Sequence, residues 1–329
     1  MILLWGLSGD GPLDAVRAAL DTRRASVAFL DQRRVLETEI ELSVGSEITG
    51  MLRCGELAIS LADVTSVFLR LYDANQLPAV ATAPPLGRHH AASVEDALAS
   101  FCELSPALVV TRPSVTGDNG SKPHQLVRIR AAGFDVPETL VTTDAEAARA
   151  FWASHKTVIY KSISGTRSVV SKLTAAHEDR LSDLRNCPTQ LQAWVPGTDY
   201  RVHVVGTECF ACRIVSKADD YRYAAQHGRD ASITSAKLPA EIRDRCIKLA
   251  HSMELPLAGI DLRLTPSGEW FCFEVNPAPG FTFFAERAHQ PVTAAVAALL
   301  AGTVPVPTRQ ARSNKHASSG KGPRRPRAR

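Results

Sequence analysis

The chain has 329 residues, of which 45% are hydrophobic and 22% charged, so it is long enough for two or three globular domains. Its longest apolar runs are too short to span a bilayer, and the apolar run at its start has no basic flank, so we expect a first strand, not a signal peptide, and a cytoplasmic protein. The net charge of +4 divides unevenly: residues 309–329 carry eight basic and no acidic side chains, and the remainder carries 30 basic and 34 acidic ones.

The first hundred residues alternate apolar and helical segments, which is the βαβ pattern of a small parallel sheet. We expect Ser93 to cap a helix, and His89 and His90 just before it to be surface histidines of a loop. The predicted strands lie at 2–7, 25–31 and twice within 55–73, and the predicted helices at 14–23 and 93–104.

The segments that follow mix helices with hairpins. We expect Ser121 to cap a helix that ends before Gly133, a hairpin around Gly206, and a second hairpin that turns at 265–269. The predicted strands cover 109–111, 134–143, 157–162, 168–173, 189–195, 200–216 and 258–276, and the predicted helices cover 121–132, 144–155, 238–255 and 290–301.

The basic tail and the cysteines give weaker signals. Residues 309–329 are rich in Ser, Gly and Pro and hold almost no large apolar side chains, so we expect them to be disordered; contact with nucleic acid is an alternative. Cys209 and Cys212 form a single C-x-x-C pair, and the two-residue period of a strand puts them on opposite faces. Buried thiols are therefore favoured over a metal or redox site.

The second hairpin carries polar side chains inside an apolar ribbon. If Thr265 pairs with Trp270 around a four-residue loop, Asp261 pairs with Glu274, and both point to the face that Asn276 shares. Two carboxylates at about 5 Å cannot both stay ionised without a cation. Hard oxygen ligands of this kind suit Mg²⁺ or Mn²⁺, which also bind substrate phosphates. The alternative is a shifted register, in which both carboxylates reach solvent and pair with Lys or Arg.

Two lysines upstream point to phosphate. Lys161 ends the apolar strand VIYKS and enters the loop SISGTRS, which contains Ser164 and Gly165. A lysine beside such a loop can hold phosphates with its charge and with backbone N–H groups. Lys122 begins the preceding helix; each lysine taken alone could equally be a surface cation.

The order of these segments resembles the ATP-grasp superfamily. The segments are Lys122, AAGFDVPETLVTTD, VIYKSISGTRS, LQAWVPGTDYRV, GIDLRL and EVNPAPG, and they cover about residues 105–300. They are most similar to RimK-like carboxylate–amine ligases and to related enzymes that cross-link ribosomal peptides. The resemblance implies an α/β (α+β) chain in which an ATP-grasp fold follows a small α/β pre-ATP-grasp domain. The expected parts are an N-terminal domain at 1–110, a central subdomain at 111–195, a C-terminal subdomain at 196–302 and the tail at 303–329.

The resemblance also implies roles for particular residues. Lys122, Lys161, Ser164 and Gly165 would contact ATP phosphates. The hinge strand that reads adenine with its backbone would be formed by Gln192, Ala193, Trp194 and Val195. Asp199 would hold the ribose, and the metals, Mg²⁺ or Mn²⁺, would be bound by Asp261, Glu274 and Asn276. The residues facing the phosphate or acyl phosphate would be Arg201, Arg222 and, more loosely, Arg213.

Two positions depart from the pattern. Ala193 stands where the family often has Glu, so adenine recognition would rest on the backbone. The loop SISGTRS has one glycine where richer loops are common, and Arg167 could add charge there.

The implied activity is ATP-dependent joining of a carboxylate to an amine or alcohol through an acyl phosphate, with release of ADP and phosphate. The acceptor could be a small amine or a peptide, and the enzyme could instead be a macrocyclase that cross-links side chains of a ribosomal precursor peptide. A third alternative is a nonenzymatic nucleotide-binding module whose basic tail binds nucleic acid. We expect no membrane partner and a homo-oligomer.

Overall fold

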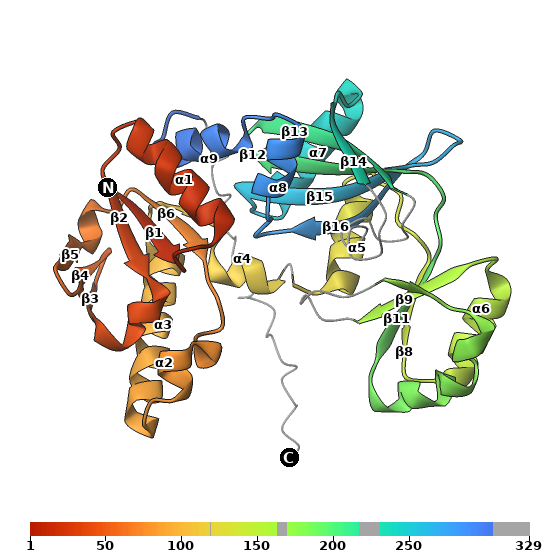
Figure 1. Ribbon diagram of the computed structural model, residues 1–329, viewed down its shortest axis with the longest axis horizontal. Helices are drawn as coiled ribbons and strands as arrows, with labels where there is room; N and C mark the ends of the chain where they lie inside the picture. Colours follow the sequence, from red (N-terminus) through yellow and green to blue (C-terminus); the bar gives the residue numbers. More distant parts are fainter. Residues whose placement is uncertain (119, 163–169, 217–230, 305–329) are drawn as a thin grey trace, which may run out of the picture.

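The computed structural model describes residues 1–118, 120–162, 170–216 and 231–304. These residues form a mixed α/β structure with four sheets, which confirms the predicted fold class. Figure 1 shows an elongated molecule: the N-terminal unit lies at one end, a small sheet lies at the other, and a five-stranded sheet lies between them. The predicted phosphate loop, Arg222 and the basic tail lie outside the described residues. The predicted domain boundaries stay a prediction.

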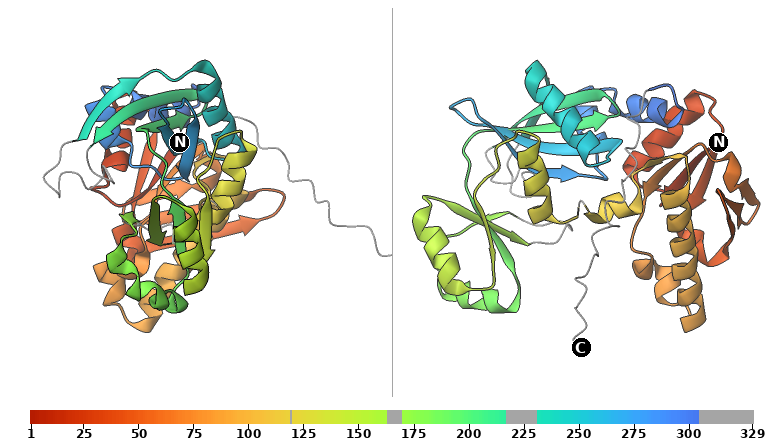
Figure 2. Two further views of the ribbon diagram at one scale, coloured as in Figure 1. Left: turned by 90° about the vertical axis from the view of Figure 1, so that its right-hand side faces the viewer. Right: turned by 180° about the vertical axis from the view of Figure 1, so that it is seen from behind.

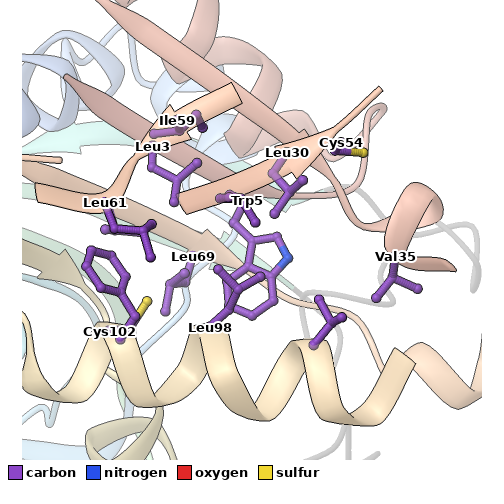
Figure 3. Packing of buried hydrophobic residues seen from close by; sticks show 14 of the residues in the cluster. Leu3, Trp5, Leu30, Val35, Cys54, Ile59, Leu61, Leu69, Leu98 and Cys102 are labelled. Atoms are coloured by element: carbon purple, nitrogen blue, oxygen red, sulfur yellow. The ribbon is translucent and has the colours of Figure 1, made fainter. Parts of the chain in front are cut away.

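A four-stranded parallel sheet forms the centre of the N-terminal unit, in the order β2-β1-β6-β7. Alternate residues of β1 face opposite layers. Leu3 and Trp5 pack toward α3 (Figure 3), and Ile2 and Leu4 pack toward α1 and α9. Burial on both faces explains why these strands are almost continuously apolar. The elements are β1 (Ile2–Gly6), α1 (Gly11–Thr22), β2 (Val27–Asp31), β6 (Ser66–Arg70), α2 (Pro78–Ala81), α3 (Pro85–Leu104), β7 (Leu108–Val110) and α9 (Val292–Leu300).

A three-stranded antiparallel meander covers part of the same core; its third strand is the first of the two predicted within 55–73, and the other two strands were not predicted. Its strands are β3 (Thr38–Val44), β4 (Ile48–Cys54) and β5 (Leu57–Ser60). Helix α3 begins at Pro85, so the prediction of a start at Ser93 is wrong. Because proline is favoured in the first helical turn, Pro85 begins this helix and places His89 and His90 inside it. His90 is not a loop histidine; its Nε2 lies 3.1 Å from the carbonyl oxygen of Thr38.

A small antiparallel sheet, in the order β10-β9-β11-β8, lies at the far end of the molecule. One face packs on α6 through Val158, Leu191 and Ala148. The opposite face, by strand alternation, carries Lys161 and Gln190, which are paired across β9 and β11. The elements are β8 (Thr139–Thr142), α6 (Ala145–Ser154), β9 (Val158–Ser162), β10 (Ser171–Lys172) and β11 (Thr189–Ala193).

The five-stranded sheet is antiparallel, in the order β14-β13-β12-β15-β16. Its apolar face packs on α7 and α5 (Figure 2). Helix α8 covers part of the other face through Phe284, together with Ala288 just after it. Helix α9 continues the chain onto the N-terminal sheet, where Ser66 donates to the carbonyl of Leu300 at 2.7 Å. The elements are α4 (Pro113–Asp118), α5 (Lys122–Ala131), β12 (Thr198–Val205), β13 (Glu208–Ser216), β14 (Ala231–Ala236), α7 (Ala240–Ser252), β15 (Leu257–Leu264), β16 (Trp270–Asn276) and α8 (Thr282–Arg287).

The closing hairpin has a different register from the predicted one. Leu264, not Thr265, pairs with Trp270, so the loop has five residues. A β-bulge at Phe273 then adds one residue to β16, and Asp261 faces Glu274 as predicted. The predicted loop was wrong by one residue, and the bulge cancels that error at the two carboxylates.

None of the helices in the described ranges combines the length and hydrophobicity that a membrane span requires.

Candidate active site

The polar face of the five-stranded sheet brings together side chains from β12 and β15. The register pairs Asp199 with Arg263, Arg201 with Asp261, and His203 with Gly259. Directly opposed residues of antiparallel strands point to the same face. The result is a row of charged and polar groups on the face opposite the α7 core.

Arg201 occupies the centre of this row. It is 6% exposed, and its Nη1 donates to Oδ1 of Asp261 at 2.8 Å. The guanidinium therefore provides part of the positive charge that the two carboxylates require. Gly259 makes room for it: a Cβ at position 259 would overlap the Arg201 guanidinium and lie 2.7 Å from Cβ of Pro279.

His203 supports Arg201 from the same strand. Nε of Arg201 donates to Nε2 of His203 at 3.3 Å. Burial, with a further contribution from the Arg201 charge, holds the pKa of His203 well below its ordinary value. The ring is therefore a neutral acceptor that fixes the guanidinium, and Phe284 packs against both groups.

The strand that carries Glu274 and Asn276 is held by an amide on α5. Gln125, which is buried, donates from Nε2 to the carbonyl of Val275 at 2.8 Å and accepts from the Val275 N–H at 3.0 Å. The Gln125 carboxamide thus makes the two backbone hydrogen bonds at Val275 that a neighbouring strand would make. Val275 lies between Glu274 and Asn276. Lys122 lies one turn earlier on α5 and is also buried.

The loop after Asn276 is fixed from the N-terminal unit. Nη1 of Arg70 donates to the carbonyls of Ala278 and Pro279 at 2.9 and 3.3 Å, while its other nitrogens form a two-bond pair with Asp10. Thr111 donates to the carbonyl of Pro277 at 3.0 Å. Two side chains from distant sequence therefore set the conformation of Pro-Ala-Pro-Gly.

The donor set fits a hard divalent cation. Asp261 and Glu274 oppose each other, and the described residues contain no ion pair to Glu274. Oδ1 of Asn276 accepts from the N–H of Ala278 at 2.9 Å, which holds the carboxamide in place. Nowhere in the described ranges do three His, Cys, Asp or Glu side chains gather as metal ligands. A metal here would need Asn276, water or phosphate to complete its oxygen ligands.

Arg263 is a site residue that the sequence analysis missed. It forms a two-bond ion pair with Asp199, at 2.7 and 3.0 Å, and donates to the carbonyl of Val195 at 2.7 Å. Its guanidinium also lies over the Trp194 ring, 4.8 Å from the centroid. The predicted ribose ligand and the predicted hinge are therefore joined by one arginine.

The predicted hinge, residues 192–195, begins with Gln192 on the polar face of the small sheet. The backbone N–H groups of Ala193 and Trp194 already donate, to the carbonyls of Glu138 and Thr157. Gln192 donates to Thr139 at 3.0 Å. Lys161, which is 8% exposed, lies on the same face as Gln192.

Arg213 is not brought to this site. It pairs with Tyr200, one residue out of phase with Arg201, and so belongs to the opposite face of the sheet. Ser164, Gly165, Arg167 and Arg222 lie outside the described residues. Cys209 and Cys212 lie on opposite faces, as strand alternation predicted, and Cys212 packs with Phe284.

Two signals in the sequence could have identified the missed residues. Arg263 lies two residues after Asp261, so strand periodicity alone places it on the same face as Asp261. Gln125 lies one turn after Lys122, which places both on one helix face. His203 lies two residues after Arg201, so the same strand periodicity places it beside that guanidinium. Arg70 offered no comparable signal, because its role depends on contacts between distant segments.

The RimK-like ATP-grasp domain family matches residues 118–300. No curated protein matches the sequence.

Among solved structures, the chain is similar to a RiPP-associated ATP-grasp ligase of Chryseobacterium gregarium in complex with ADP and a leader and core peptide. The identity is 23% and the TM-score 0.81, over 93% of this chain and 97% of that one. The macrocyclase MdnC from Microcystis aeruginosa, bound with the precursor peptide MdnA, shares 22% identity with a TM-score of 0.78, over 92% and 100%. The ATP-grasp ligase PsnB, complexed with minimal precursor, Mg and ADP, shares 27% identity with a TM-score of 0.72, over 92% and 97%.

Proposed function

Because this chain belongs to the RimK-like ATP-grasp family, it is an ATP-dependent ligase, and we propose that it joins a carboxylate to an amine or a hydroxyl on a ribosomal precursor peptide. The observation that carries the proposal is the pairing of Asp261 with Glu274 beside Arg201, on a face that meets the hinge through Arg263 and Trp194.

The chemistry needs no protein nucleophile. An oxygen of the substrate carboxylate attacks the γ-phosphorus of ATP, and the bond to the β-phosphate oxygen breaks to give an acyl phosphate and ADP. The amine or hydroxyl then attacks the acyl carbon, phosphate leaves with the bonding electrons, and the nucleophile loses its proton. The protein contributes positioning and charge neutralisation.

We assign Asp261, Glu274 and Asn276 to a divalent metal, Mg²⁺ or Mn²⁺, which would neutralise phosphate charge when bound. Arg201, held by Asp261 and His203, would face the transferred phosphoryl group. Its fixed position is the useful property, because a preorganised donor needs no reorganisation during the reaction.

The ATP contacts fall on the small sheet and the hinge. We assign Lys122 and Lys161, with Ser164 and Gly165, to the phosphates. The adenine would contact the backbone at Gln192–Val195, where the N–H groups of Ala193 and Trp194 are already engaged, so the contact falls to the remaining backbone groups. Asp199 would bind the ribose while keeping its pair with Arg263.

Solved structures that align with this chain over nearly their whole length support a peptide substrate. The solved structures named above contain precursor, leader or core peptides, and each alignment covers more than nine-tenths of both chains. We therefore favour cross-linking of a precursor peptide over ligation of a free amino acid. A module that only binds nucleotide would need no paired carboxylates, which argues against the nonenzymatic alternative.

The test is to incubate the full chain with ATP, Mg²⁺ and a candidate precursor peptide that carries acidic side chains and Thr, Ser or Lys acceptors. We expect each new bond to remove one water from the peptide mass and to produce one ADP. ADP formation with free amino acids and no change in the peptide would overturn the assignment of the substrate. No ADP with any carboxylate would overturn the assignment of the reaction.

A further inference from the structure

Four glutamines are buried in the described part of the chain, and they divide into two kinds. Gln32 and Gln125 use both ends of the amide, Gln32 on the backbone of Tyr72 and Gln125 on that of Val275. Gln190 is 1% exposed, and neither its Nε2 nor its Oε1 has a hydrogen-bond partner among the residues that the structure describes; on Gln192 the Oε1 has none there. Burying an amide without partners costs about 1–3 kcal/mol. A ligand that forms hydrogen bonds with Gln190 would explain why this residue is placed there.

The position of Gln190 points to the nucleotide. It lies opposite Lys161 in the register of β9 and β11 and two residues before Gln192, so all three share one face of the small sheet. The other face is the apolar core formed with α6. The unpartnered amide therefore lies directly across from the lysine that we assign to the phosphates, on the strand that continues through Gln192 into the hinge that we assign to adenine.

We infer that the Gln190 carboxamide reads the N6 and N7 edge of adenine and helps select ATP. This inference rests on the proposed ATP-binding function. Adenine presents an N6 amino donor beside the N7 acceptor, and a glutamine side chain matches both, with Oε1 accepting from N6 and Nε2 donating to N7. Guanine presents two acceptors on this edge, O6 and N7, so Oε1 would oppose O6.

The assignment also accounts for a departure in the sequence. Ala193 occupies the hinge position where the resemblance leads us to expect Glu, so the hinge lacks one side-chain acceptor for the adenine amino group. Gln190 offers a replacement from the same strand. The Nε2 of Gln190 also donates, so the protein recognises the N7 atom of adenine as well as the amino group.

The experiment compares binding of ATP, 7-deaza-ATP and GTP to the full chain by calorimetry, in wild type and in Gln190→Leu. 7-Deaza-ATP keeps the amino group and replaces N7 by a carbon that cannot accept a hydrogen bond. We expect wild type to bind ATP about tenfold more tightly than 7-deaza-ATP. We expect Gln190→Leu to bind the two nucleotides equally and to discriminate less against GTP.

Two controls separate this role from a structural one. Gln32→Leu removes a buried amide with partners far from the site, so it should lower the unfolding temperature and keep the wild-type ratio of ATP to 7-deaza-ATP affinity. Gln190→Leu removes unpartnered groups, so its nucleotide-free unfolding temperature should not fall.

Equal binding of ATP and 7-deaza-ATP by wild type would overturn the inference without any variant. An unchanged ratio in Gln190→Leu would overturn it as well. Failure of wild type to bind ATP at all would be a different result, because it would contradict the proposed function itself.

Discussion

At the scale of single residues, the site depends on one arginine being held in one position. Arg201 contacts Asp261, His203 and the Phe284 ring, and it can lie over β15 because residue 259 has no side chain. A buried guanidinium is stable only where such partners satisfy it. Sequence motifs identified Arg201 and Asp261, but the need for Gly259 follows from the close approach of two strands and a loop.

Gly259→Ala should therefore impair the reaction. The added methyl group would displace the Arg201 guanidinium or Pro279, at a cost of about 1–3 kcal/mol. We expect a loss of ADP formation of roughly tenfold or more together with a lower unfolding temperature. Gly45→Ala, in the turn between β3 and β4 with open space around its Cβ position, should leave ADP formation unchanged. Equal activity of both variants would contradict the account of Arg201.

Buried thiols predict how stability depends on alkaline pH. Burial raises the pKa of Cys102 from its ordinary 9.0 to about 12. Between these values the unfolded chain releases a proton that the folded chain retains, so stability is complete below pH 9 and falls as pH rises toward 12.

The Cys102→Ala variant isolates this effect. Between pH 9 and pH 11 it should lose about 2 kcal/mol less unfolding free energy than wild type, because its residue 102 has no proton to release. Denaturant unfolding at each pH measures the difference. Parallel curves for the two proteins would show that Cys102 does not titrate as described.

At the scale of secondary-structure elements, the hairpin shows what sequence could and could not predict. Alternation of apolar and polar residues placed Asp261, Glu274 and Asn276 on one face of the hairpin. It also placed Cys209 and Cys212 on opposite faces of their strand. The loop length and the bulge at Phe273 could not be predicted, because register depends on turn geometry and cross-strand packing. Strands β3 and β4 of the meander were missed, and α3 begins at Pro85, where we had predicted a loop.

Gln125 is the contact that ties α5 to β16, and Gln125→Leu tests it. The substitution leaves the N–H and C=O of Val275 buried without partners, which should lower the unfolding free energy by about 2 kcal/mol or more. Denaturant titration would measure the loss. Gln190→Leu, equally buried and with unpartnered amide groups, should show none. A similar loss in both variants would mean that burial alone, and not the bonds to Val275, explains the effect.

At the scale of the whole molecule, the N-terminal unit helps to build the site. Arg70 joins Asp10 to the carbonyls of Ala278 and Pro279, and α9 lies on the N-terminal sheet beside α1 (Figure 1). The sequence predicted the order of the parts and their fold class. It could not predict this joint, because nothing local to Arg70 indicates a partner 208 residues away.

Arg70→Lys should weaken that joint while keeping the charge. Lysine cannot make the two-bond pair with Asp10 and also reach two carbonyls. We expect several-fold more Mg²⁺–ATP to be needed for half-maximal ADP formation, and a loss of about 1–3 kcal/mol in unfolding free energy. The control is Arg23→Lys, whose single contact to the carbonyl of Ala294 is 3.5 Å long. If the two variants behaved alike, Arg70 would have no special role in holding the loop after Asn276.

The central claim is that Asp261 and Glu274 form the metal side of an ATP-dependent ligase, and the rate of ADP formation in Glu274→Gln tests it most directly. The assay contains Mg²⁺ and a carboxylate-bearing peptide, and Glu269→Gln in the turn of the same hairpin serves as the control. We predict that Glu274→Gln lowers the rate by about a hundredfold or more at an unchanged unfolding temperature, while Glu269→Gln stays within about twofold of wild type. Turnover of Glu274→Gln at the wild-type rate would contradict the account.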